Sequence, residues 1–201
     1  KISFVIKKTE EIMEDSEYQG VRLSLDAYLD KTRIPLKIDI STGDVITPCE
    51  ISFSYQLMFE NRTIPLLAYP PETVLAEKLE TILSRGEANT RLRDFYDVYI
   101  LQREDFVVTP DALCHALLAT CRKRGHEDLL HTYASILDRV RQSDTMRTQW
   151  MKYQSDFDYA AGITWDTVLD TVETLCMKTL DDHAFGDELP QEESQFEMHL
   201  L

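Results

Sequence analysis

Four charged residues between positions 71 and 101 have types and spacings that could do chemistry. Lys78 and Arg85 are seven residues apart, so on a helix both lie along one edge and could contact one shared anion. Asp94 and Asp97 are three residues apart, which places both carboxylates on one helical face. Because a carboxylate buried without a partner is costly, this pair needs a cation, a metal ion or a polar cleft. The stretch is therefore the first candidate site in the chain.

Each of these residues also has an ordinary structural interpretation. Arg93 and Asp97 have the i,i+4 spacing of a surface ion pair, and Asp94 suits the start of a helix. Lys78 could pack its stem on an apolar surface and keep its ammonium group in water. Residue types alone favour these structural interpretations, because single-residue signals are weak.

A further carboxylate stands out on a predicted strand, residues 36–40. Apolar residues alternate there with Lys37 and Asp39, so the Asp39 side chain faces away from the apolar layer. In that position Asp39 could hold a metal ion in a cleft. The alternative is a strand whose polar face is simply wet, and the residues alone favour that alternative.

Two helices must position the charged residues of the first stretch. Pro71 suits the first position of a helix, and Gly86 is expected to end that helix. Glu77 and Glu80 lie on the side of this helix opposite its apolar stripe. Thr90 is expected to cap a second helix. That second helix carries apolar residues nearly all round, so it should be largely buried together with its two aspartates.

The rest of the chain divides into strands followed by helices. An N-terminal strand is expected over residues 2–7, with a helical turn near Glu10–Glu14 after it. Strands first and helices later predict an α+β fold, a small mixed β-sheet followed by a C-terminal helical bundle. The further strands are expected over residues 21–29, 36–40, 50–57 and 63–68, and the further helices over residues 110–123, 127–142, 144–158 and 165–180.

The predicted elements and the distribution of charge divide the chain into three regions. We expect an α+β domain over residues 1–105, a helical region over residues 106–182 and an acidic flexible tail over residues 183–201. From Asp181 onward there are seven acidic residues and no Lys or Arg, and the whole chain has a net charge of −15. This balance argues against a general binder of polyanions, because phosphate contacts need clustered Lys and Arg.

Cysteine, histidine and apolar patterns bear on other classes of protein. The four cysteines form no C-x-x-C pair and no regular framework, which fits a reduced, cytoplasmic setting. The five histidines have no zinc-binding spacing. The sequence contains no apolar run of about 18 residues, so no membrane span is predicted.

Two blocks of residues resemble the signature of the AbiEii nucleotidyltransferase toxins, which belong to bacterial type IV toxin–antitoxin systems and act in abortive infection. Both blocks lie in the order that the family has. The resemblance extends over about residues 1–125. The matching segments are Lys37–Asp44, Ala76–Glu80, Ser84–Gly86, Asn89–Arg91 and Arg93–Asp97.

The resemblance implies an enzyme that moves a nucleotide from a nucleoside triphosphate (NTP) to an RNA acceptor, with tRNA as the expected class. It also implies a β-sheet of the nucleotidyltransferase type and a magnesium ion (Mg2+) bound by Asp39. An AbiEi-type antitoxin is the implied partner, and phage resistance is the implied outcome.

The same resemblance implies roles for individual residues. Lys78 would neutralise the triphosphate, and Arg85 would be a second phosphate contact. Asp94 and Asp97 match a late acidic motif, in which one aspartate acts on the acceptor or orients Lys78. The implied catalytic residues are Asp39, Lys78, Asp94 and Asp97.

One motif of the family has no match in this sequence. Two further metal-binding carboxylates would come from an Asp-x-Asp pair after Gly-Gly or Gly-Ser, and no such pair is found. Asp156-Phe157-Asp158 matches by spelling, but it stands in the wrong order and in a helical context. We therefore expect residues 1–105 to be the remainder of a nucleotidyltransferase-like domain, and the chain to be a fragment that is inactive alone.

Two other classes of function stay open. A non-catalytic interaction module of the same fold would bind a partner through its C-terminal helices and acidic tail, and Asp39, Lys78 and Asp94 would not need to converge. A metal-dependent nuclease would use Asp39, Asp94 and Asp97 together with Lys78. Such a nuclease would be active without an upstream Asp-x-Asp pair.

Overall fold

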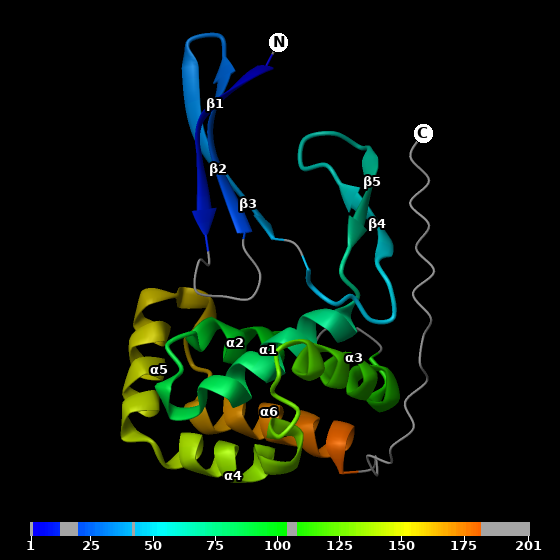
Figure 1. Cartoon of the computed structure of the whole chain (residues 1–201). Helices are drawn as coiled ribbons and strands as arrows, with labels where there is room; N and C mark the ends of the chain where they lie inside the picture. Colours follow the sequence, from blue (N-terminus) through cyan, green and yellow to red (C-terminus); the bar gives the residue numbers. More distant parts are fainter. Residues whose placement is uncertain (1, 13–19, 42, 104–107, 182–201) are drawn as a thin grey trace. The chain divides into compact units, whose positions relative to one another are not determined.

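The computed structural model has an α+β fold, with strands first and helices later, as the sequence predicts (Figure 1). No helix in the described part of the chain is long and apolar enough to cross a membrane. The structure describes residues 2–12, 20–41, 43–103 and 108–181.

The chain divides into two compact units, residues 1–46 and residues 47–201. The predicted division between an α+β domain and a helical region at residue 105 stays a prediction. The predicted acidic tail, residues 183–201, lies outside the described residues.

The first unit is an antiparallel sheet of three strands in the order β1-β2-β3. The middle strand buries Leu25 and Ala27 on one face and Asp26 on the other, where Asp26 Oδ1 lies 3.0 Å from Arg33 Nε. The strands are β1 (Ile2–Ile12), β2 (Gly20–Leu29) and β3 (Thr32–Ser41).

One sequence prediction in this unit is wrong. The helical turn expected near Glu10–Glu14 is replaced, as far as Ile12, by the continuation of β1. The reason is cross-strand pairing, because Glu10 lies opposite Arg22 in the ladder between β1 and β2. Residues 13 and 14 lie outside the described residues.

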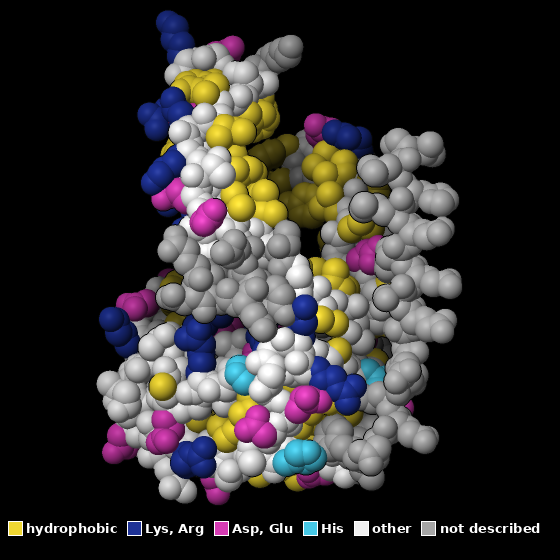
Figure 2. Space-filling view, in the orientation of Figure 1, with side chains coloured by type: hydrophobic (Ala, Val, Ile, Leu, Met, Phe, Trp, Pro, Cys, Tyr) yellow, Lys and Arg dark blue, Asp and Glu magenta, His cyan; other side chains and the backbone are white. Residues whose placement is uncertain are grey.

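The apolar face of the first unit is exposed. Phe4 and Ile6 of β1 are each 64% exposed, and Ile38 of β3 is 47% exposed. Figure 2 shows hydrophobic side chains gathered on the surface over the strands. A single sheet has no second layer within its own unit, so most of the apolar side chains on these three strands stay exposed.

The second unit begins with a hairpin of two antiparallel strands, β4 (Ile51–Gln56) and β5 (Thr63–Ala68). Thr47 precedes the hairpin, and its N–H donates to Thr73 Oγ1 at 2.9 Å. The Thr73 hydroxyl donates in return to the Thr47 carbonyl at 3.0 Å. Because Thr73 belongs to α1 (Pro71–Arg85), these two bonds attach the start of the unit to its first helix.

Six α-helices follow in the described residues, and side chains cap three of their N-termini. Thr109, Ser143 and Thr164 each accept a hydrogen bond from the backbone N–H three residues later, which satisfies one of the free donors of the first turn. The helices are α1, α2 (Leu92–Leu101), α3 (Pro110–Lys123), α4 (Leu129–Gln142), α5 (Asp144–Asp156) and α6 (Trp165–Leu180).

The helices enclose one hydrophobic core, and α1 is central to it. Leu75, Leu79 and Ile82 of α1 are at most 1% exposed, as their three- and four-residue spacing predicts. α1 packs against α2, α3 and α4, and α6 packs against α2, α3, α4 and α5 (Figure 1). Phe95 of α2 and Trp150 of α5 are among the largest fully buried side chains.

Leu79→Ala should destabilise the second unit by about 2–5 kcal/mol, because Leu79 is 0% exposed and its removal leaves a cavity in the core. The matched control is Leu67→Ala on β5, where the leucine is 76% exposed and its loss should cost little. Urea unfolding followed by circular dichroism at helix wavelengths measures both variants. Equal unfolding midpoints for the two would contradict the assignment of α1 as the centre of the core.

Candidate functional site

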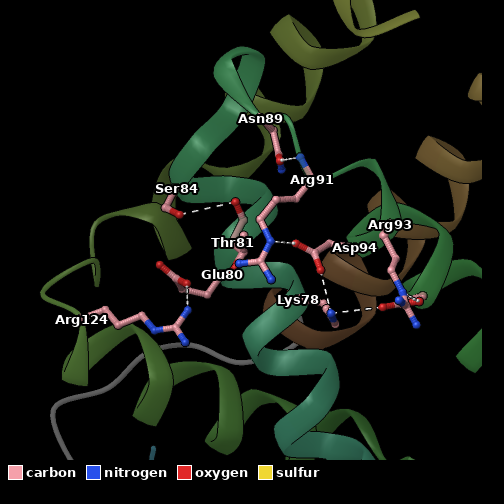
Figure 3. Close-up of polar contacts among 10 residues, drawn as sticks. Lys78, Glu80, Thr81, Ser84, Asn89, Arg91, Arg93, Asp94 and Arg124 are labelled. Carbon is pink, nitrogen blue, oxygen red and sulfur yellow. Dashed lines mark hydrogen bonds and ion pairs between the residues drawn. The ribbon is translucent and has the colours of Figure 1, made fainter. Parts of the chain in front are cut away.

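Lys78 bridges two carboxylates of the neighbouring helix. Its Nζ lies 2.7 Å from Asp94 Oδ1 and 3.1 Å from Asp97 Oδ2. The Asp94 side chain is 3% exposed, whereas that of Asp97 is 21% exposed. Figure 3 shows Lys78 of α1 and Asp94 of α2 pointing toward one another. The prediction that the carboxylates of α2 need a partner is confirmed, and the partner is Lys78.

Two arginines complete this charged cluster. Arg91 Nε lies 3.2 Å from Asp94 Oδ2, and Arg93 Nε lies 3.7 Å from Asp97 Oδ1. Arg93 is the one exposed residue of the ten in α2, so the helix is buried nearly all round, as predicted. With every group ionised, the cluster of Lys78, Arg91, Arg93, Asp94 and Asp97 has three cations for two carboxylates.

The turn between α1 and α2 positions Arg91, the first residue of the cluster after α1. Gly86 follows α1 with a φ of 49°, in the left-handed region that favours glycine. Asn89 is 0% exposed, and its Oδ1 accepts a hydrogen bond of 2.7 Å from the Arg91 N–H. The predicted Thr90 cap is wrong, because Arg91 occupies the N-cap position and the side chain of Asn89 shapes the turn instead.

Lys78 stays charged in this setting. Burial disfavours its ammonium form, but hydrogen bonds and charge from Asp94 and then Asp97 outweigh burial and raise the pKa of Lys78 above its ordinary value. Lys78 is therefore a fixed cation at neutral pH rather than a proton acceptor. A fixed cation suits the binding of an anionic group such as a phosphate.

The cluster lines a pocket of about 670 Å³ formed by α1, α2 and α5. This volume is ordinary for a small-molecule site. Its charged lining comprises four cationic and three carboxylate side chains, so the pocket is locally cationic in a chain of net charge −15. The lining residues are Lys78, Thr90, Arg91, Leu92, Arg93, Asp94, Asp97, Gln149, Lys152, Tyr153, Asp156 and Phe157.

Asp39 belongs to the first unit, on β3, where it pairs with Arg22 of β2. Arg22 donates from Nε to Asp39 Oδ1 at 2.6 Å and from Nη2 to Oδ2 at 2.7 Å. These hydrogen bonds lower the pKa of Asp39. Both carboxylate oxygens are thus engaged by a guanidinium group, and the described residues include no group of three or more His, Cys, Asp or Glu that could hold a metal ion. The arrangement described does not fit Mg2+, and the metal role of Asp39 stays a prediction.

Arg85 lies apart from the pocket lining. It is the last residue of α1 and is exposed, and the described lining takes its guanidinium groups from Arg91 and Arg93. The phosphate-binding role of Arg85 therefore also stays a prediction. Of the residues implied by the resemblance, the structure brings together Lys78, Asp94 and Asp97.

Sequence reasoning missed the burial of one carboxylate on α1. Glu80, expected on the polar side of the helix, is 2% exposed. Arg124 forms a short ion pair with it, and His126 Nδ1 lies 2.7 Å from Glu80 Oε1. Figure 3 shows Glu80 and Arg124 in contact. Arg124 and His126 come from the loop after α3, so no local pattern in the sequence could have linked them to Glu80.

The cysteines described as buried are inert, which agrees with the apolar role that the sequence suggests. Cys114, Cys121 and Cys176 are buried free thiols. Burial raises the pKa of Cys121 and of Cys176 to about 12, so neither forms a thiolate near neutral pH. The described pocket lining contains no cysteine, so the chemistry of the pocket depends on its charged and aromatic side chains.

A family model described as nucleotidyl transferase AbiEii toxin, type IV TA system, matches residues 1–171. The match extends past the limit of about residue 125 suggested by the motifs, and it includes every residue that lines the pocket. No curated protein and no solved structure matches the chain.

Glu80→Ala should destabilise the second unit by about 1–3 kcal/mol, because it removes the charged hydrogen-bonding contacts of a 2% exposed carboxylate with Arg124 and His126. The control is Glu87→Ala, which removes a 52% exposed carboxylate 3.9 Å from Arg139 and should cost under about 0.5 kcal/mol. Thermal and urea unfolding measure both. A Glu80→Ala protein as stable as the Glu87→Ala protein would show that the Glu80 cluster does not hold α1.

Proposed function

We propose that this chain, which belongs to the AbiEii nucleotidyl transferase toxin family of type IV toxin–antitoxin systems, transfers a nucleotide from an NTP to an RNA acceptor. The acceptor is tRNA, and an AbiEi-type antitoxin counteracts the activity. Growth arrest by this reaction provides resistance to phage. The pocket around Lys78 is the site at which the chain's own residues bind the triphosphate.

The observation that carries this proposal is the position of Lys78. Its ammonium group is held by Asp94 and Asp97, its side chain is 23% exposed, and the residue lines the pocket together with Arg91 and Arg93. A charged group fixed in advance binds a phosphate without the entropy cost of ordering a free side chain. The triphosphate oxygens would contact the ammonium group of Lys78 and the guanidinium groups of Arg91 and Arg93.

The two aspartates differ in access, which suggests different roles. Asp94 is 3% exposed and holds both Lys78 and Arg91, so it acts as a positioning residue. Asp97 is 21% exposed and faces the pocket, so an acceptor hydroxyl can reach it. In the proposed step the hydroxyl oxygen bonds to the α-phosphorus, its proton passes to Asp97, and the bond to the departing pyrophosphate breaks.

Mg2+ would neutralise phosphate charge in such a reaction. Because both oxygens of Asp39 are bound by Arg22 in the described arrangement, no step is assigned to the metal through this residue. Arg85 is proposed as a secondary phosphate contact outside the described pocket lining. Arg91 is better placed for a direct contact, since it lines the pocket and pairs with Asp94.

Lys78→Ala should weaken binding of inorganic tripolyphosphate about 10-fold or more, because it removes the cation that Asp94 and Asp97 hold at the pocket. Isothermal titration calorimetry on the purified protein measures this change. Lys178→Ala is the matched control, since Lys178 is an exposed lysine on α6 and is not part of the pocket lining. Equal affinity in the wild type and in Lys78→Ala would overturn the proposed phosphate site.

Asp97→Asn should lower the turnover of nucleotide transfer about 100-fold or more while leaving the KM for NTP nearly unchanged, because a proton acceptor is lost. Asp94→Asn should instead raise KM, because Lys78 loses its closest carboxylate. The assay uses protein expressed from its complete reading frame, α-labelled NTPs, Mg2+ and total bacterial tRNA. Transfer that survives in both variants at the wild-type rate would refute this division of roles.

A further inference from the structure

One wall of the pocket comes from α5, a helix that contributes no residue to the segments that resemble the family signature. Gln149, Lys152, Tyr153 and Asp156 are spaced by three, four and seven residues, so they share one face of the helix. Phe157 follows at the C-cap and also lines the pocket. This wall faces the same cavity as Lys78, and it has no role yet in the proposed reaction.

The α5 wall carries a stack of aromatic rings that leads from the core to the pocket. Trp150 is 1% exposed and stacks on Tyr153 with ring centres 5.4 Å apart and planes 23° apart. Tyr153 in turn contacts Phe157, with ring centres 4.7 Å apart. Trp150 is fixed by a hydrogen bond of 2.8 Å from its indole N–H to the Ile163 carbonyl. The ring of Tyr153 is therefore supported from beneath by an immobile one.

The far end of this stack is exposed and consists of two rings, because Phe157 stacks on Tyr159 with ring centres 5.3 Å and planes 30° apart, and Tyr159 is 51% exposed. Phe157 is 42% exposed although it is wholly apolar. It lies at a pocket that also contains Lys152, Lys78 and the two arginines of α2. Exposed aromatic rings next to cations are the combination with which proteins bind nucleotides, because the ring stacks on a base while cations contact phosphates. Such stacking strengthens binding roughly 5- to 150-fold per base.

Gln149 supplies a polar group on the same wall. Its Oε1 is buried and has no hydrogen-bond partner among the described residues. A buried amide oxygen without a partner calls for an explanation, and a bound ligand is one. An amide can donate from its nitrogen or accept at its oxygen, so rotation of the side chain would let it contact the edge of any base.

From these contacts we propose that Phe157 and Tyr153 form a base-stacking subsite for the nucleotide whose phosphates contact Lys78. The inference rests on the proposed function, because it places the base of the same NTP at the α5 wall. The terminal base of an RNA acceptor has the same stacking chemistry, and the experiment separates these two sources.

The test compares ATP with inorganic tripolyphosphate, which has the phosphates and lacks the base. In the wild-type protein ATP should bind about 10-fold more tightly than tripolyphosphate by calorimetry. In Phe157→Ala this ratio should fall to about one, while the affinity for tripolyphosphate stays unchanged. Phe157→Trp should keep the preference for ATP. Phe59→Ala is the matched control, because Phe59 is 93% exposed and outside the pocket lining.

Tryptophan fluorescence gives a second readout of binding. The sequence has two tryptophans, and Trp150 stacks directly on Tyr153. ATP should change the tryptophan emission at concentrations at which tripolyphosphate does not. A short single-stranded RNA is titrated in the same way. If RNA changes the emission and ATP does not, and RNA binding weakens in Phe157→Ala, then the subsite holds the acceptor base.

The outcomes also separate this inference from the function on which it rests. Tripolyphosphate binding that depends on Lys78, with ATP and RNA both insensitive to Phe157→Ala, would overturn the stacking subsite and leave the phosphate site standing. Tripolyphosphate binding that is absent or independent of Lys78 would overturn the phosphate site. Absence of binding by ATP and RNA as well would overturn both.

Discussion

The position of the pocket depends on two buried ion pairs that leave α1 in opposite directions. Lys78 and Glu80 are two residues apart, which is about 200° around a helix. Lys78 therefore reaches Asp94 of α2, whereas Glu80 reaches Arg124 after α3 (Figure 3). His126 contacts Glu80 from the same loop. A buried charge that loses its partner costs several kcal/mol. Rotation of α1 about its axis would break both sets of contacts together, so the rotation is fixed more sharply than an apolar stripe could fix it. This constraint also holds the ammonium group of Lys78 at the pocket.

The regular elements follow from local patterns, and the exceptions have identifiable causes. The helix predicted over residues 110–123 is found as Pro110–Lys123, because Thr109 caps it and its apolar spacing is uniform. Glu80 could not be predicted as buried, because Glu77 and Glu80 look alike in the sequence and the partners of Glu80 are 44 and 46 residues away. The prediction of a cap at Thr90 is wrong for a more local reason. The buried side chain of Asn89 competes for the same turn and satisfies the Arg91 N–H.

Some features of the site could likewise be predicted from local sequence, whereas others depend on residues that are distant in the chain. The need of Asp94 and Asp97 for a cation follows from their place on an almost wholly apolar helix, and Lys78 meets it. Strand alternation correctly places Asp39 on the polar face of β3, but its partner Arg22 is defined only by the register between β2 and β3. The α5 wall contains none of the segments that resemble the family signature. Its polar residues read as an ordinary solvated helix face, and only the packing of α5 next to α2 brings them to the pocket.

Net charge is a poor guide to what this pocket can bind. The chain has 21 Lys and Arg and 36 Asp and Glu, yet four of the seven charged residues lining the pocket are cationic. Charges farther away than about 8–10 Å are largely screened at physiological salt, so the side chains in contact decide whether a phosphate is held. The net charge of −15 supplies no general attraction for a polyanion. An RNA acceptor would then be held through few phosphate contacts, and its affinity would depend only weakly on salt concentration. Selection of the acceptor would fall to the groups inside the pocket, which gives the rings and the amide of α5 more influence than they would have on a basic surface.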